Sequence, residues 1–290
     1  MNKIKVIVGA TATGKTKRAI EFAKTCDGEI INCDSMQIYK DLNILTASPS
    51  SAEMSEIKHK LFGYLDFDQK TSAVDWAKLA SSEIKQTLAI GKTPVIVGGT
   101  GLYIKTLVDG ISPLPEVSPN IRKCAHELAK QNFDELCKQV YQFDDELENL
   151  MPKSMHHQLI RAYEIMKETG KSIREFWALP KIKFIDNVDF EFEVLNCERT
   201  ELYERIATRF DDMLKNGAIT EVQNLLVKIN NRNRQVVFEQ YPIFRTIGAK
   251  EITLFLDGVY SFDKMHEIAI KNSRHYAKRQ ITWFKKEGSK

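Results

Sequence analysis

The chain has 290 residues, of which 43% are hydrophobic and 28% charged, and its formal net charge is +3, values in the ordinary globular range that allow a substantial core in one large or two unequal domains. No long uncharged apolar run could span a bilayer, and the N-terminus has the pattern of a strand entering a glycine loop instead of a cleavable signal, so we expect a cytoplasmic protein. The five cysteines are odd in number and widely spaced, which excludes a disulfide framework or a zinc site and predicts reduced thiols.

Short apolar segments alternate with helical ones through the first hundred residues. The strings KVIV (5–8), EIINC (29–33) and PVIVGG (94–99) have the composition of buried strands, and residues 15–24 and 76–89 have helical patterns. Apolar strands separated by helices are typical of parallel sheets that are covered on both faces. We therefore predict an α/β fold, with a P-loop NTPase-like parallel sheet flanked by helices.

The second part of the chain has a different texture. A proline-containing stretch at 111–119 opens a polar, helical segment with no strand-like run, and FEFEV (190–194) then alternates like an edge or half-covered strand. We predict a core of residues 1–118 and 187–290, interrupted by a smaller all-helical insertion domain at 119–186. Helical patterns follow the strand, with Gly217 as a helix stop, and a long basic helix is predicted at 262–286.

Residues 9–16, GATATGKT, match the pattern of a phosphate-binding P-loop, between a strand and a helix as that motif requires. Such a loop turns its backbone amides inward, Lys15 supplies a mobile charge, and the Thr16 hydroxyl can bind Mg2+. Kinases, ATPases and GTPases share the motif, so it does not identify a reaction. The predicted diphosphate-binding residues are Gly9, Ala10, Thr11, Ala12, Thr13, Gly14, Lys15 and Thr16.

Two further loops follow predicted strands at the same edge of the sheet. Asp34 ends the second strand, where it could serve as a magnesium ligand, a general base or a helix N-cap, and its position leaves these roles open. After the third strand, three glycines surround Thr100 and would let the backbone and the hydroxyl approach a ligand closely. A purely structural glycine turn is the alternative.

Taken in order, these strings are specific. The chain resembles the bacterial tRNA dimethylallyltransferase family in GATATGKT, EIINCDSMQIYKDLNILTASPS, PVIVGGTGLYIKTL, ERTELYERIATRFDDMLKNGAITEV, FRTIGAKE and SRHYAKRQITWF. The resemblance runs from about residue 4 to 285. It implies transfer of a dimethylallyl group from dimethylallyl diphosphate to the N6 amine of the adenosine 3′ to the tRNA anticodon, releasing diphosphate. The oligomeric state stays open, although an asymmetric RNA clamp would work as a monomer.

The resemblance also assigns roles to individual residues. In this family the aspartate of the DSMQ string acts as the base on the target amine, which implies that role for Asp34. The GGTG threonine and an arginine of a later helix contact the leaving diphosphate, which implies Thr100 and Arg209. Without the resemblance, Arg209 would be interpreted as a solvated residue or a partner of Asp212. The P-loop, Mg2+ and Arg209 would stabilise the charge that develops on diphosphate.

The target adenosine must leave its stack to reach a diphosphate held in the core. The resemblance therefore implies that the insertion grips the anticodon stem-loop and that core residues surround the base. The chain has Met155 and Gln158 where the family commonly has Asp and Arg. The predicted tRNA-binding residues are Asp34, Ser35, Met36, Gln37, Thr100, Arg122, Gln158, Leu159, Ile160, Arg161 and Ala162.

Two other classes of function stay open on the residues alone. A P-loop kinase acting on a small metabolite would share the phosphate cradle, although no adenine-binding elements can be identified. A non-catalytic RNA-binding protein or NTP switch would use the insertion and the basic C-terminal segment. It would leave Asp34 and Thr100 without a chemical role.

Overall fold

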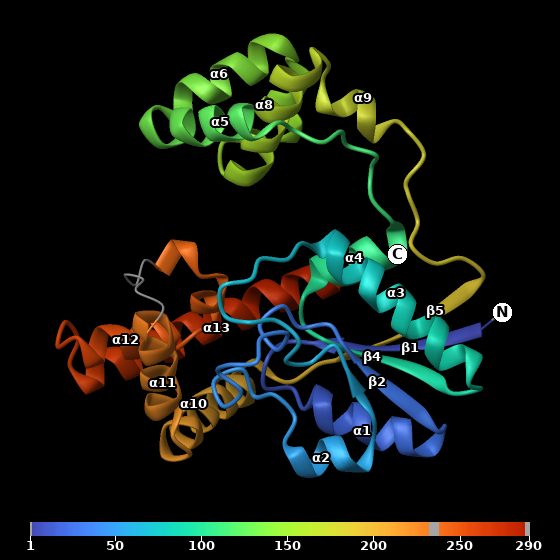
Figure 1. Ribbon diagram of the computed structural model, residues 1–290, viewed down its shortest axis with the longest axis vertical. Coiled ribbons are helices and arrows are strands. Elements are labelled where there is room, and N and C mark those ends of the chain that lie inside the picture. Colours follow the sequence, from blue (N-terminus) through green and yellow to red (C-terminus); the bar gives the residue numbers. More distant parts are fainter. Residues whose placement is uncertain (1, 232–237, 288–290) are drawn as a thin grey trace. The chain divides into compact units, whose positions relative to one another are not determined.

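The structure is a computed structural model of the chain, and it describes residues 2–231 and 238–287 (Figure 1). The chain divides into two compact units, Met1–Val108 with Phe184–Lys290, and Asp109–Lys183. The second unit starts and ends earlier than the predicted limits of 119 and 186, because Ile111 and Ile182 pair as an antiparallel bridge that joins the two connecting segments. Among the described residues, no helix has the length and apolarity needed to cross a membrane.

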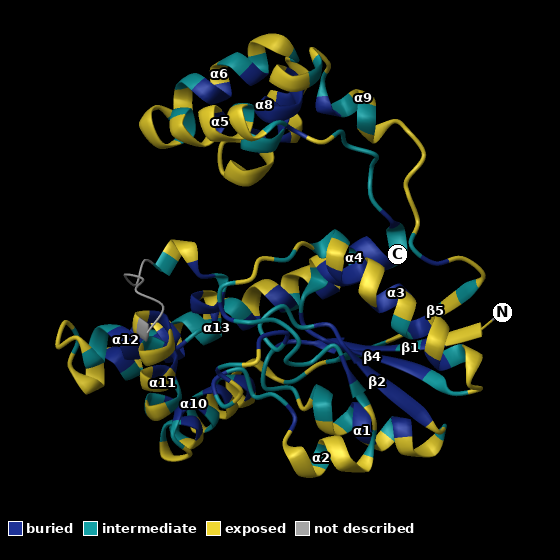
Figure 2. Cartoon of the chain, in the orientation of Figure 1, coloured by how far each residue is buried: buried dark blue, intermediate teal, exposed yellow. Residues whose placement is uncertain are grey.

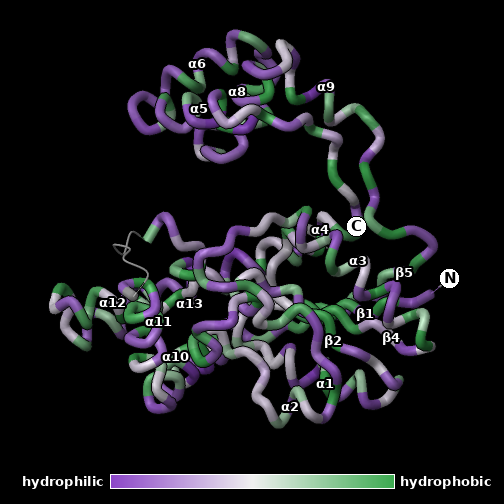
Figure 3. The backbone as a smooth tube through the Cα atoms, viewed as in Figure 1, coloured by the Kyte–Doolittle hydropathy of each residue, from purple (hydrophilic) through white to green (hydrophobic). Residues whose placement is uncertain are grey.

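Five strands form one parallel sheet in the order β3-β2-β4-β1-β5. Its central strands are fully buried along most of their length, as Figure 2 shows, and they are rich in hydrophobic residues, as Figure 3 shows. The prediction of an α/β fold with a parallel sheet is confirmed. The strands are β1 (Asn2–Gly9), β2 (Gly28–Asn32), β3 (His59–Lys60), β4 (Thr93–Gly98) and β5 (Val188–Leu195).

Strand β5 lies at the edge of the sheet, as its alternating sequence predicted. Its alternate acidic side chains pair with cations on neighbouring elements. Lys5 of β1 contacts Glu191 at 3.1 Å and Glu193 at 3.2 Å, and Arg18 contacts Glu193 at 2.5 Å. The alternation in FEFEV therefore reflects one charged, paired face and one apolar face.

Helices cover both faces of the sheet (Figure 1). One face packs on α1 (Lys15–Thr25), and the other packs on α3 (Ala73–Ala89) through the fully buried Trp76. The remaining helices of the core before the insertion are α2 (Ser51–Glu56) and α4 (Gly101–Asp109). The sheet is therefore held rigidly, and the loops at its carboxyl edge start from fixed points.

A second apolar core forms among the C-terminal helices. The loop after β2 contributes Ile38, Tyr39 and Leu42 to it, each buried to 2% exposure or less, so this loop is anchored on the helices. Gly217 separates the first two helices, as predicted. The helices are α10 (Arg199–Lys215), α11 (Ala218–Asn231), η1 (Phe238–Gln240), η2 (Pro242–Arg245), α12 (Ala249–Leu256) and α13 (Phe262–Glu287).

The second unit, described throughout, consists of helices around a small core of its own. Ala125, Leu136 and Leu159 are fully buried in that core. The helices are α5 (Pro119–Gln131), α6 (Phe133–Phe143), α7 (Glu146–Leu150), α8 (His156–Thr169) and α9 (Ile173–Trp177).

Candidate active site

The P-loop connects β1 to α1, as its sequence predicted. Gly14 has φ 85° and ψ 20°, a left-handed conformation that favours glycine, while Ala12 carries a φ of 65° without being glycine. The Lys15 ammonium donates to the carbonyl of Ala10 at 2.6 Å, and the Thr13 hydroxyl donates to the same carbonyl at 2.8 Å. The Lys15 side chain therefore folds back onto the P-loop, where its charge can attract a bound phosphate.

The electrostatics of the loop suit an anion. Burial lowers the pKa of Lys15 from 10.5 to about 8, and the charge of Arg209 lowers it further, while Asp34 acts in the opposite direction. Burial also lowers the pKa of Arg209, again opposed by Asp34. Both side chains are half-buried, so an anion bound beside them would replace part of the hydration that they have lost.

A cavity of about 680 Å³ opens beside the P-loop, which contributes Thr11 to its wall. It brings together the three residues predicted to be catalytic, which come from three separate elements of the chain. Two of the predicted tRNA-binding neighbours, Ser35 and Met36, also line it. Gln37 does not, because its amide donates to the carbonyls of Thr46 and Ala47 and so fixes the loop after β2. The predicted residues on the cavity wall are Asp34, Ser35, Met36, Thr100 and Arg209.

Asp34 lies in a tight backbone turn at the end of β2. Its Oδ1 accepts the N–H of Met36 at 2.9 Å, and its own N–H donates to Oδ1 of Asn32 at 2.8 Å. No helix begins at this position, so the N-cap interpretation of Asp34 is wrong. The carboxylate is instead fixed at the carboxyl edge of the sheet, facing the cavity.

Thr100 ties its own turn to the Asp34 loop. Its hydroxyl accepts the N–H of Ser35 at 2.9 Å and lies 3.3 Å from the Ser35 hydroxyl, while its N–H donates to the carbonyl of Cys33 at 3.1 Å. A hydrogen bond also joins Thr100 to the hydroxyl of Tyr276. The threonine therefore has a fixed position next to the carboxylate.

Arg209 points from α10 to the P-loop, where its Nη2 donates to the hydroxyl of Thr11. Asp212, the alternative partner suggested by helix spacing, instead contacts Lys215 at 3.7 Å. The guanidinium is thus directed at the phosphate cradle and not along the surface of its own helix. This placement supports a role toward an anion bound in the loop.

The three glycines around Thr100 are explained by protein contacts and not by the approach of a ligand. An added Cβ would lie 2.1 Å from the carbonyl oxygen of Cys33 at Gly98, 2.0 Å from Nε2 of Gln280 at Gly99, and 2.2 Å from Nε1 of Trp283 at Gly101. The structural interpretation of this turn is therefore correct for the glycines. Thr100 alone presents a functional side chain to the cavity.

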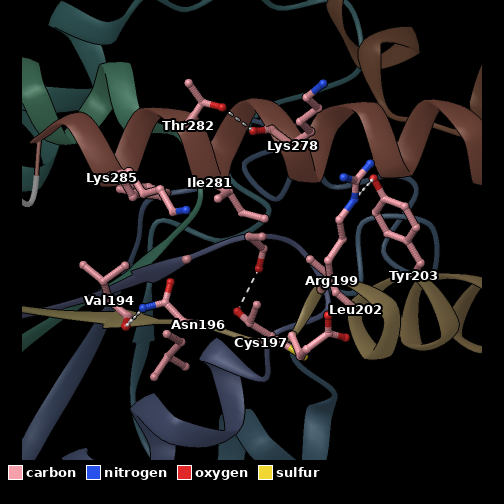
Figure 4. Close-up of a pocket in the computed structure, with 16 residues that line it drawn as sticks. Val194, Asn196, Cys197, Arg199, Leu202, Tyr203, Lys278, Ile281, Thr282 and Lys285 are labelled. Carbon is pink, nitrogen blue, oxygen red and sulfur yellow. Dashed lines mark hydrogen bonds between the residues drawn. The ribbon is translucent and has the colours of Figure 1, made fainter.

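A second cavity, of about 810 Å³, reaches the P-loop at Gly9, Ala10 and Thr13 (Figure 4). Its wall carries apolar side chains together with one acid, Glu198, and three cations, Arg199, Lys278 and Lys285. The Arg199 guanidinium lies 5.2 Å from the centre of the Tyr203 ring, and its Nε donates to that tyrosine's hydroxyl at 3.1 Å. This cavity was not predicted from the sequence, although the SRHYAKRQITWF string contains one of its cations.

The first cavity has further residues that the sequence analysis did not select. Tyr276 and Arg279 of α13 line it, as does Arg245, which ends η2. Burial raises the pKa of Tyr276 well above its usual value, so this phenol stays protonated at neutral pH. The signal was available, because these residues lie in the SRHYAKRQITWF and FRTIGAKE strings.

The predicted tRNA-binding residues of the insertion divide into two groups. Arg122 and Gln158 are exposed, but Leu159 and Ala162 have 0% and 2% of their surface exposed and pack in the core of the insertion. The prediction that Leu159 and Ala162 contact RNA through their side chains is therefore wrong. The helical period turns these two residues inward while their neighbours lie at the surface. The half-buried residues are Ile160 and Arg161.

Arg161 is engaged within the insertion. It contacts the buried carboxylate of Glu164 at 2.9 Å and donates to the carbonyl of Pro115 at 3.0 Å. Its side chain remains 30% exposed, which leaves part of the guanidinium accessible to a partner.

The P-loop residues fit a magnesium ion that is held mainly by its substrate. Among the described residues, no three His, Cys, Asp or Glu side chains gather as a metal site. Mg2+ bound through substrate phosphates needs only one or two protein ligands, and the Thr16 hydroxyl is a ligand of the required hard oxygen type.

The chain is similar to known proteins over nearly its whole length. A family model described as IPP transferase matches residues 37–287. The tRNA dimethylallyltransferases of Rickettsia felis and Rickettsia canadensis are each 38% identical to it, over 98% of this chain and 90% and 86% of theirs.

Solved structures agree with these matches. A eukaryotic dimethylallyltransferase acting on tRNA has a TM-score of 0.82 and 27% identity, covering 98% of this chain and 70% of its own. The full-length tRNA isopentenylpyrophosphate transferase of Bacillus halodurans has a TM-score of 0.67 and 30% identity, covering 98% of this chain and 87% of its own. The chain therefore belongs to the IPP transferase family, a family of transferases.

Proposed function

We propose that this chain is a tRNA dimethylallyltransferase that transfers a dimethylallyl group from dimethylallyl diphosphate to the N6 amine of the adenosine 3′ to the anticodon. The observation that carries the proposal is that Asp34, Thr100 and Arg209 line one cavity beside the P-loop. The allylic C–O bond of the donor breaks, a C–N bond to the amine forms, and diphosphate leaves. The amine loses one proton, which the Asp34 carboxylate accepts.

The P-loop holds the diphosphate of the donor. Its amides and the α1 N-terminus favour the anion, and Lys15 and Arg209 supply charge where the leaving group becomes more negative. Mg2+ bound with Thr16 and the diphosphate would add further stabilisation of that charge. Because the cations are half-buried and already in place, little reorganisation is needed when the C–O bond breaks.

The two cavities suggest separate places for the two substrates. The cavity with Arg199, Lys278 and apolar side chains suits an amphiphilic prenyl diphosphate, since it combines cations with hydrocarbon surface. The cavity with Asp34 and Thr100 suits the adenine amine, since it supplies the base and a hydroxyl. Both reach the P-loop, so the substrates would meet there from two directions.

The insertion would bind the anticodon stem-loop, with Arg122, Gln158 and the accessible part of Arg161 as its surface contacts. Ser35 and Met36 would surround the extracted base, with Gln37 holding their loop in place. We also propose that the chain works as a monomer and that it acts in the cytoplasm, where its tRNA substrate would be.

The test is a direct assay with two possible donors. Purified protein is incubated with Mg2+, an unmodified tRNA transcript that has adenosine 3′ to the anticodon, and either dimethylallyl diphosphate or ATP. Digested RNA is then weighed by mass spectrometry. We expect a C5H8 gain on that adenosine with the prenyl donor alone, abolished in Asp34→Asn and kept in Asp189→Asn, a control on the exposed part of β5.

Two results would contradict the proposal. One is ATP turnover without any gain of mass on several tRNAs, which would indicate a P-loop phosphotransferase. The other is a gain of mass that Asp34→Asn leaves at the wild-type rate, which would remove Asp34 from the role of base.

A further inference from the structure

The amide of Gln280 joins two loops that are far apart in the sequence. Its Oε1 accepts the backbone N–H of Thr11 at 2.8 Å, and its Nε2 donates to the carbonyl of Gly99 at 2.9 Å. The side chain is only 4% exposed, so water cannot readily replace either bond. One buried amide therefore connects the P-loop directly to the turn that carries Thr100.

Gln280 belongs to one face of α13 that docks on the same turn. Tyr276, Gln280 and Trp283 have the i, i+4, i+7 spacing of a single helix face. Tyr276 is hydrogen-bonded to Thr100, and Trp283 lies against Gly101 so closely that a Cβ there would be 2.2 Å from its Nε1. Helix α13 thus contacts this turn through residues on both sides of Gln280.

We propose that Gln280 is a positioning residue that sets the P-loop at a fixed distance from Thr100, an inference that rests on the proposed function. The backbone that it holds at Thr11 carries the hydroxyl to which Arg209 donates. The carbonyl that it holds at Gly99 precedes Thr100 directly. Gln280 therefore fixes the groups around the leaving diphosphate relative to the groups around the amine.

The chemistry of the two partners explains why the side chain is an amide. An N–H needs an acceptor and a carbonyl needs a donor, and the glutamine amide supplies one of each without a charge. A carboxylate could not donate to the Gly99 carbonyl, and an ammonium could not accept from Thr11. A hydrophobic side chain of similar size would leave both backbone groups buried and unpaired.

The first experiment separates positioning from general stability. Gln280→Met fills the same volume and removes both hydrogen bonds, while Met265→Ala destabilises the fully buried part of α13 far from the two loops. We expect Gln280→Met to lower kcat about 10- to 100-fold with the KM for both substrates changed less than threefold, since displacing reacting groups by about 1 Å can have that effect. Met265→Ala should keep kcat within about twofold at a temperature where both variants stay folded.

Hydrogen exchange gives a readout that does not require activity. In the unliganded wild type, peptides covering residues 9–16 and 98–104 should exchange slowly, and in Gln280→Met both should exchange at least tenfold faster. Met265→Ala should leave these two peptides unchanged. If the wild type transfers no prenyl group, the proposed function fails, but exchange still decides whether Gln280 holds the loops.

A second perturbation acts on the bridge from the other side. Gly99→Ala places a methyl group where Nε2 of Gln280 lies, so it should lower kcat to a similar extent. In the Gln280→Ala background the added methyl group has room. Adding Gly99→Ala to that variant should therefore lower kcat by less than a further twofold. The inference is overturned if Gln280→Met keeps wild-type kcat, if its loss matches that of Met265→Ala, or if the two effects multiply independently.

Discussion

The pH dependence of donor use tests the charge of Lys15. Its pKa of about 8 means that the ammonium is mostly present at pH 7 and mostly lost at pH 9. If the ammonium binds diphosphate, kcat/KM for dimethylallyl diphosphate at saturating tRNA should be flat below pH 7.5. It should then fall about tenfold per unit above about pH 8, because this parameter reports the form of the enzyme that has not yet bound the donor.

The pH range near 8 suits this test, because nearby phenols and a nearby thiol have pKa values raised above their usual range. Burial raises the pKa of Tyr39 to about 12, and it raises the pKa of Tyr103 and Tyr276 further. Burial also raises the pKa of the Cys33 thiol well above its usual value. A fall near pH 8 would therefore be assigned to the lysine and not to one of these phenols or to the Cys33 thiol.

Lys15→Met is the matched control, since it keeps most of the side-chain volume without the charge. Its kcat/KM should be low and flat between pH 7.5 and 9, and the wild-type value should approach it as the pH rises. A variant that showed the same alkaline fall as the wild type would refute the assignment, because the titrating group would then lie elsewhere.

Further predictions follow from contacts of the same region. Asp34→Asn should lower kcat by about 10²- to 10⁴-fold in single-turnover assays and affect tRNA affinity in filter binding far less. Arg209→Met should lower kcat by about 10²- to 10³-fold; Arg205→Met, on the exposed side of the same helix, is its control, and equal losses would contradict the role of Arg209. Glu221→Ala should lower the free energy of unfolding in urea by about 2–4 kcal/mol, since its carboxylate accepts two backbone N–H groups of the loop after β2, at 2.9 and 3.2 Å. Lys15→Met should raise the melting temperature of the unliganded protein at pH 7; a lower value would mean that the lysine charge stabilises the fold.

Much of the fold could be predicted from local patterns. The buried strands and the P-loop helix follow from apolar runs and glycine spacing, which act over a few residues. Strand β3, by contrast, is only His59–Lys60 and has no apolar run of its own. It exists because it pairs with β2, a tertiary effect that a short sequence window does not contain.

Site residues that lie in backbone motifs could be predicted from the sequence. The hydrogen-bond partners of residues on packed helices could not. Asp34 and Thr100 follow strands that end at the same edge of the sheet, so their proximity could be inferred. Helix spacing, however, suggested Asp212 as the partner of Arg209, and only the packing of α10 directs the guanidinium to Thr11. The same holds for Gln280, whose two partners are 181 and 269 residues away.

The electrostatics of the P-loop show why this site is built at the expense of stability. A lysine whose pKa falls from 10.5 to about 8 on folding is held charged at neutral pH at a cost of roughly 3 kcal/mol. The pKa of about 8 already includes the opposing effect of the Asp34 charge, and in the unliganded protein the ammonium donates to the carbonyl of Ala10. A bound diphosphate would offset this cost, because its negative charge favours the ammonium. Since the unfolded chain binds the proton more tightly, stability should rise between pH 8 and 10.5, the range in which donor binding weakens.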